Sequence, residues 1–74
     1  MIILSQNEDA IFDFDKAHNV YAQEGTVYIS SYTGEEGFPL GTYKNNNVAK
    51  SVVADIFVMY GSTDKYEMPK EWEL

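Results

Sequence analysis

The chain has 74 residues, of which twelve are acidic and five are lysine, and its net charge is −7 at pH 7. A chain of this length builds one domain with a thin core, so residues 1–74 are expected to form a single domain. The negative charge disfavours direct binding to nucleic acid and attachment to anionic membranes, because both carry negative charge themselves. A basic protein partner remains compatible with this charge.

The sequence has no cysteine, so neither a disulfide nor a thiolate metal site can form. The apolar start, residues 1–4, is too short for a signal peptide. No stretch approaches the roughly 18 apolar residues that a membrane span needs. These features together predict a cytoplasmic protein.

The first half of the chain has the patterns of short strands. Residues 2–5 are expected to form one strand. Residues 10–15 alternate, with Ala10, Phe12 and Phe14 on one face and Ile11, Asp13 and Asp15 on the other. Residues 20–23 and 26–32 flank Glu24-Gly25, where glycine supplies the positive φ of a tight turn, and this predicts a β-hairpin.

The second half adds a strand, a helix and a short final strand. Residues 38–43 are expected to form a strand with Pro39 at an edge, because proline lacks a ladder donor. Apolar residues then recur at helical spacing and predict a helix over about 46–60, with Asn45, Asn46 or Asn47 as the N-cap and Gly61 just beyond its end. Residues 65–68 are a further candidate strand.

The predicted fold class is therefore α+β: an antiparallel sheet of four to five strands with one helix packed on one face. The order of residues 70–74 is left open. The expected core consists of Ile3, Phe12, Phe14, Val27, Ile29, Leu40, Val52, Val53, Ile56 and Phe57.

Several short motifs carry a resemblance. Leu40-Gly41-Thr42-Tyr43-Lys44 leads into the helix, and Tyr66-Glu67-Met68-Pro69 follows it. The order of these motifs resembles that in a group of small uncharacterised proteins carried by phages and mobile elements of Gram-positive bacteria. Such proteins tend to have acidic residues in the first helical turn, where this chain has Asn46 and Asn47. The resemblance implies a fold and a context and brings no catalytic residues.

No motif in the sequence predicts catalysis, a metal or a cofactor. Asp13 and Asp15 pair two carboxylates, but a cation site needs further oxygen ligands, and a solvated strand face explains them better. His18 is the single histidine and is interpreted as a surface residue. Residues 34–37, Gly-Glu-Glu-Gly, lack the lysine and hydroxyl of a phosphate loop. We therefore expect no enzyme, no cofactor and no small-molecule substrate.

The aromatic residues favour a protein-interaction role through a protein partner or self-association. Tyr28, Tyr32, Tyr43 and Trp72 are the candidate interface residues, since amphipathic rings are enriched at interfaces; core packing is the alternative for the tyrosines. The contact is expected on the sheet face that the helix leaves uncovered or at the edge near Pro39. An alternative function is an acidic inhibitor of a nucleic-acid enzyme, a DNA mimic of the anti-restriction or anti-CRISPR type.

Overall fold

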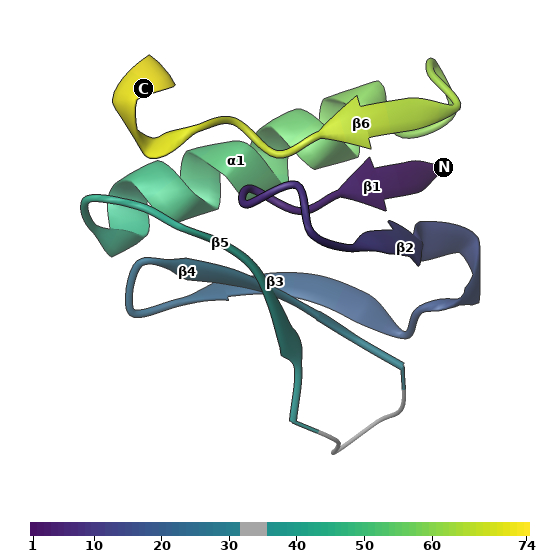
Figure 1. Cartoon of the computed structure of the whole chain (residues 1–74), viewed down its shortest axis with the longest axis horizontal. Helices are drawn as coiled ribbons and strands as arrows, with labels where there is room; N and C mark the ends of the chain where they lie inside the picture. Colours follow the sequence, from purple (N-terminus) through teal and green to yellow (C-terminus); the bar gives the residue numbers. More distant parts are fainter. Residues whose placement is uncertain (32–35) are drawn as a thin grey trace.

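The computed structural model describes residues 1–31 and 36–74 (Figure 1). One α-helix and six strands make up its regular elements, together with two short 3-10 helices, Phe14–Lys16 and Glu71–Glu73. The longer elements are β1 (Ile2–Leu4), β2 (Ile11–Asp13), β3 (Asn19–Gln23), β4 (Thr26–Ser30), β5 (Phe38–Thr42), α1 (Asn46–Met59) and β6 (Lys65–Glu67).

The strands form two sheets of three, so the fold class is α+β, but the single sheet of four to five strands is not what the structure contains. One sheet has the order β2-β1-β6 and the other β3-β4-β5. In Figure 1 the two sheets lie one above the other and α1 runs alongside them. The helix packs against β3 and β4, and its Asp55 accepts a hydrogen bond from Tyr66 of β6.

The pairing of β1 explains how the first sheet arises. β1 pairs antiparallel with β2 and parallel with β6, bringing Ile3 opposite both Phe12 and Tyr66. A parallel pair needs a crossover between its strands, and here the crossover contains the second sheet and α1. The antiparallel prediction is therefore wrong for β6.

The helix begins and ends close to the predicted positions. The Asn45 side chain accepts a hydrogen bond from the Val48 amide at 3.0 Å, so Asn45 is the N-cap among the three candidates. The chain leaves the helix through Tyr60, and Gly61 follows with φ of 84°. Asn46 has a separate role, since its side-chain oxygen accepts from the Gly25 amide at 3.1 Å. This bond fastens the helix to the β3–β4 turn.

That turn confirms the predicted hairpin. Glu24 and Gly25 both have positive φ, 51° and 86°, as a two-residue turn between strands requires. Gly25 also lies close to other backbone, because a Cβ at this position would stand 3.2 Å from the Tyr43 carbonyl oxygen. A side chain at position 25 would therefore be strained by both conformation and contact.

The core lies between the two sheets and the helix. Six of the ten expected core residues are buried, and Phe12, Phe14 and Val53 pack partly buried against them. Phe57 is 82% exposed, so its placement in the core was wrong. The helix turns Ala49, Val52 and Ile56 inward, and Phe57 lies about 100° further around the axis. The other buried hydrophobic residues, which are absent from the expected core, are Tyr43, Ala49, Tyr66 and Met68.

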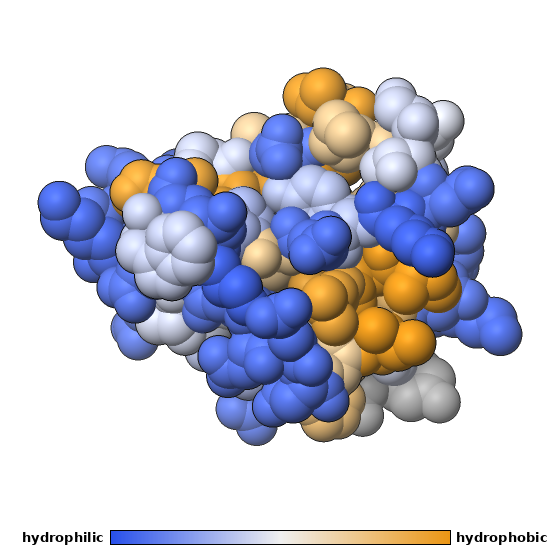
Figure 2. Space-filling model, turned by 45° about the horizontal axis from the view of Figure 1, so that its top comes forward, coloured by the Kyte–Doolittle hydropathy of each residue, from blue (hydrophilic) through white to orange (hydrophobic). Residues whose placement is uncertain are grey.

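The outer face of the β2-β1-β6 sheet is partly hydrophobic. Ile2 and Leu4 point away from the buried Ile3, and the register places Ile11, which is 68% exposed, opposite Leu4. Figure 2 shows a hydrophobic area, in orange, on the side of the molecule where β1 and β2 lie. Lys65 and Glu67 flank the same face from β6, so the area is small and bordered by charge.

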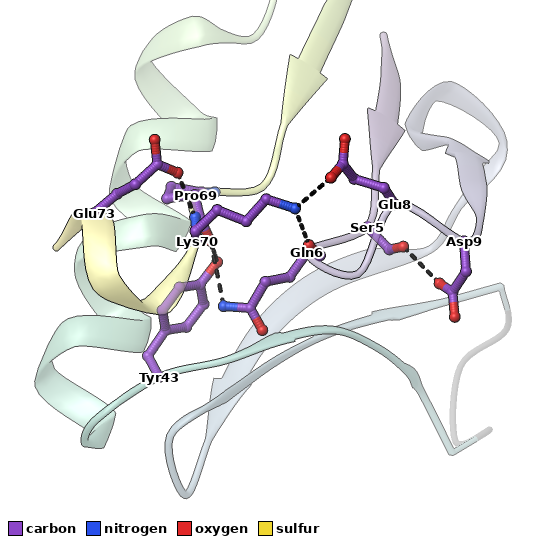
Figure 3. A network of polar contacts seen from close by, with 8 residues as sticks. All are labelled: Ser5, Gln6, Glu8, Asp9, Tyr43, Pro69, Lys70 and Glu73. Atoms are coloured by element: carbon purple, nitrogen blue, oxygen red, sulfur yellow. Dashed lines mark hydrogen bonds and ion pairs between the residues drawn. The ribbon is translucent and has the colours of Figure 1, made fainter.

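The C-terminal segment is ordered by a polar network (Figure 3). Lys70 Nζ donates to the Gln6 carbonyl at 2.5 Å and to Glu8 Oε2 at 2.8 Å, and the Glu73 side chain accepts from the Lys70 amide. The Tyr43 hydroxyl donates to the Pro69 carbonyl at 2.8 Å. Lys70 is therefore fastened to the loop after β1, and the preceding Pro69 is fastened to Tyr43, between β5 and α1.

Burial makes the Tyr43 hydroxyl a probe of folding at alkaline pH. Loss of solvation and the negative charge of Glu73 raise the pKa of Tyr43 to about 12, against 10.0 ordinarily. The unfolded chain therefore loses this proton first, and we expect the free energy of unfolding to fall as the pH rises from about 10 towards 12. Denaturant titrations over this range measure the fall.

The control for this prediction is Tyr43→Phe, which removes the titrating group and keeps the ring. Burial and the bond to Asp55 also raise the pKa of Tyr66, so part of the fall remains in the variant. The free energy of unfolding of the variant should fall less steeply with pH than that of the parent. Identical slopes in the two proteins would contradict the role of Tyr43.

Candidate functional site

An apolar groove runs between α1 and β3. Two adjoining hollows of about 700 and 680 Å³ share Val20, Val53 and Phe57 as lining residues. We call their union the α1–β3 groove. Its full lining consists of Phe14, Asp15, Ala17, Val20, Tyr21, Ala22, Asn46, Lys50, Val53, Ala54, Ile56, Phe57 and Tyr60.

The groove exists because α1 covers the sheet incompletely. Ile56 and Val52 pack inward, whereas the next residue, Phe57, leaves 82% of its surface in water. On the opposite wall, Val20 and Ala22 point to the same side of β3 and are half-buried. An exposed aromatic ring beside half-buried aliphatic side chains is a feature of interaction surfaces.

A polar cluster closes one end of the groove. The Tyr60 hydroxyl donates to Asp15 Oδ1 at 2.7 Å, and the Met1 amino group donates to Asp15 Oδ2 at 2.9 Å. These bonds, that from Tyr60 first, hold the pKa of Asp15 below its ordinary value of 3.8. The same carboxylate raises the pKa of Tyr60. Phe14 packs edge-on against the Tyr60 ring at 5.4 Å between centroids. This end of the groove is therefore a fixed carboxylate beside an aromatic pair.

The structure places the four candidate interface residues in unlike surroundings. Tyr43 is 4% exposed and bonded to Pro69, so it belongs to the core and not to an accessible surface. Tyr28 stacks on Tyr21 at 5.3 Å on the sheet face away from the core. Trp72 is 81% exposed on the C-terminal 3-10 helix. Tyr32 lies outside the described residues. No contact within the described ranges joins Tyr28, Tyr43 and Trp72 into one surface.

The edge near Pro39 is partly covered by the chain itself. Pro39 does lie in β5, an edge strand, as predicted. Gln6 covers this edge, because its amide donates to the Leu40 carbonyl at 2.7 Å and its side chain bonds both the amide and the carbonyl of Thr42 at 3.0 Å. Gln6 thus already bonds the outward backbone groups of Leu40 and Thr42.

The acidic pair Asp13 and Asp15 is not a strand face. β2 ends at Asp13, whose side chain accepts from the Asp15 amide at 3.0 Å and caps the 3-10 helix that follows. The strand therefore stops at Asp13, before the end of the predicted range 10–15, because the Asp13 side chain bonds the backbone two residues further on. His18 is exposed between this helix and β3, and its amide donates to the Ser30 carbonyl. Among residues 1–31 and 36–74 no group of acidic and histidine residues is arranged to hold a metal.

Sequence reasoning missed the groove as a site. Phe57 and Val53 were assigned to the core because they continue the apolar stripe of the helix, and Val20 was assigned only to a hairpin arm. One signal was present: the stripe from Val48 to Tyr60 is wider than a single packed face needs, which indicates surplus apolar surface.

Fold and site together define a small α+β domain with an apolar groove beside an edge strand. No helix in the described part of the chain is long and apolar enough to cross a membrane. No protein-family model, no curated protein and no solved structure matches this chain.

Proposed function

We propose that this chain is a non-enzymatic protein-interaction module, of the kind carried by phages and mobile elements, that acts in the cytoplasm. Its binding surface is the α1–β3 groove. The observation that supports this proposal best is Phe57, an aromatic residue 82% exposed on the groove wall. A ring that is 82% exposed buries little of its surface in the fold, whereas a ring buried in an interface removes roughly 150–250 Å² from water.

The charge of the chain favours a basic partner. The net charge is −7, and two exposed carboxylates lie near the ends of β3. One is Glu24, and the other is Asp15, which is also paired with the Met1 amino group. Opposite charges steer association and align the partner, while the apolar groove supplies most of the affinity. We therefore assign the groove to a partner surface that is apolar at its centre and basic at its rim.

The test uses two aspartate substitutions on adjacent helix positions. Phe57→Asp places a charge in the groove, whereas Val58→Asp places the same charge on a residue that is 68% exposed and lines no part of the groove. Each variant and the parent are immobilised, and the proteins retained from a Gram-positive bacterial lysate are quantified by mass spectrometry. We expect at least one basic protein to be retained by the parent and by Val58→Asp, and to fall about tenfold or more with Phe57→Asp.

Thermal unfolding provides the control, since both residues are exposed and both variants should melt close to the parent. Equal retention by the two variants would contradict the groove as the binding surface. A protein whose retention falls with both variants would indicate a general charge effect on the helix.

A second candidate function, an acidic inhibitor of a nucleic-acid enzyme, is favoured by a different surface. Glu8, Glu67 and Glu73 line one hollow of about 420 Å³ together with the exposed Trp72 and with Lys70, which pairs with Glu8. Carboxylates gathered around an aromatic ring suit a basic nucleic-acid groove. Binding of this kind would weaken steeply with salt, compete with DNA and be unaffected by Phe57→Asp.

A further inference from the structure

The four sheet edges differ in how they are protected. Natural edge strands avoid unwanted pairing by being short, by carrying charge or proline, by a bulge, or by a covering segment. β2 and β6 have three residues each and carry charged residues. β5 contains Pro39 and a register shift opposite Val27/Tyr28. Gln6, from the loop after β1, covers part of its edge. β3 has five residues, Asn-Val-Tyr-Ala-Gln, and none of these devices.

The register shows which backbone groups β3 turns outward. The two-residue turn makes Gln23 and Thr26 a hydrogen-bonded pair, and Tyr21 with Tyr28 is the next such pair along the ladder. The amide and carbonyl groups of the residues between them alternate to the other side. Val20 and Ala22 therefore direct their backbone groups away from β4, towards the open edge.

The same two residues line the α1–β3 groove. The side chains of Val20 and Ala22 lie on its β3 wall, opposite Val53 and Phe57 of α1. A chain that paired with β3 would thus gain backbone hydrogen bonds from the edge. It would also place every second side chain against the apolar groove. Strand addition beside a helix uses main-chain bonds for affinity and alternate side chains for selection.

We propose that the α1–β3 groove takes an extended segment of a basic protein, which adds to β3 as a further strand. This inference rests on the proposed function and specifies its partner. The segment has apolar residues at alternate positions to meet Val53 and Phe57. Lysine or arginine at its two ends faces the exposed carboxylates of Asp15 and Glu24.

Charge decides against a second copy of this chain as the occupant. Antiparallel pairing of two β3 strands would bring Asp15 of each copy towards Glu24 of the other. Each copy would also add its own net charge of −7. Like charges brought together at an interface are unfavourable, so a basic segment pairs better with this edge than β3 does with itself.

The experiment measures binding of a fluorescent peptide by anisotropy at low salt. The probe has about eight residues, with lysines at both ends and alternating valine and threonine between them. One control peptide has glutamate in place of lysine. A second has the lysine sequence with N-methyl groups on every backbone amide, which blocks pairing along both edges of the peptide. The protein variants are Ala22→Pro, which removes the outward amide, and Val58→Asp, which lies outside the groove.

We expect the lysine peptide to bind the parent and Val58→Asp about equally. Binding should weaken about tenfold or more for the glutamate peptide, for the N-methylated peptide and for Ala22→Pro. Proline is tolerated where an edge strand turns its amide to solvent, so Ala22→Pro should fold. The N-methylated peptide tests the same strand pairing on the unaltered protein, because it removes the donors of the peptide instead.

Three outcomes would overturn this inference. Equal binding of the N-methylated peptide would exclude strand addition while leaving the groove as a binding surface, which Phe57→Asp tests separately. Absence of binding by the lysine peptide at millimolar concentration would exclude the basic extended segment. A dimer of the parent in light scattering that Ala22→Pro dissociates would make the occupant a second copy of the chain.

Discussion

Ile56→Ala is expected to lower the free energy of unfolding by about 2–5 kcal/mol, as the truncation of a fully buried isoleucine does. Ile56 is 2% exposed on the inner face of α1. A domain of 74 residues has a total stability of roughly 4–11 kcal/mol at about 0.05–0.15 kcal/mol per residue. The substitution therefore removes a large part of the total. Urea titration followed by circular dichroism measures the change.

Val58→Ala is the matched control for Ile56→Ala. Both are β-branched residues of the same helix, but Val58 is 68% exposed, so its truncation should change stability by no more than about 0.5 kcal/mol. Similar losses at the two positions would contradict the inward face assigned to the helix. Ile56→Asp should leave the chain unfolded, because a charge at this position would be buried without a partner.

Tyr66→Ala is expected to cost about 3–5 kcal/mol, the range for truncating a buried aromatic ring. Tyr66 is 7% exposed on β6 and faces the core beside Ile3 of β1. Its loss would leave a cavity where the parallel β1–β6 pair meets the helix. The midpoint of urea unfolding, compared with that of the parent, measures this cost.

Tyr66→Phe separates the ring from the hydroxyl. The hydroxyl donates to Asp55 Oδ2 at 2.7 Å, and Asp55 is exposed, so water can replace the donor when it is removed. We expect this variant to lose only about 0.5–1.5 kcal/mol. If Tyr66→Phe cost as much as Tyr66→Ala, the hydrogen bond rather than the packed ring would stabilise β6.

The helix and the hairpin were predictable because their determinants are local. Asn45, the apolar spacing after it and Gly61 act within a few residues of the element that they bound. Glu24 and Gly25 likewise set the turn between β3 and β4 by their own backbone conformation. Such signals do not depend on the rest of the fold.

The pairing of the strands was not predictable from these patterns. Alternation marks a strand and its buried face but does not name its neighbour. β1 pairs in parallel with β6, about 60 residues further along the chain, and no local pattern marks that partner. The antiparallel single sheet failed for this reason, although the strands themselves were largely located.

The site was the least predictable part, because it depends on a rotation of the helix that the apolar stripe leaves undetermined. Ile56 and Phe57 are adjacent and both apolar, yet one is buried and the other is exposed. Tyr43 shows the reverse case, since its candidate interface ring is buried against the C-terminal segment. Only the tertiary packing separates core residues from surface residues here.

The parallel pair of β1 and β6 also sets the order in which the molecule can be completed during synthesis. Residues 2–4 leave the ribosome about 60 residues before residues 65–67. At about 5–20 residues per second this interval lasts roughly 3–12 s. During that time β1 can pair only with β2, and the side of Ile3 that faces Tyr66 stays uncovered. The nascent chain therefore carries its unpaired strand edge and open core until residues 65–67 have been added.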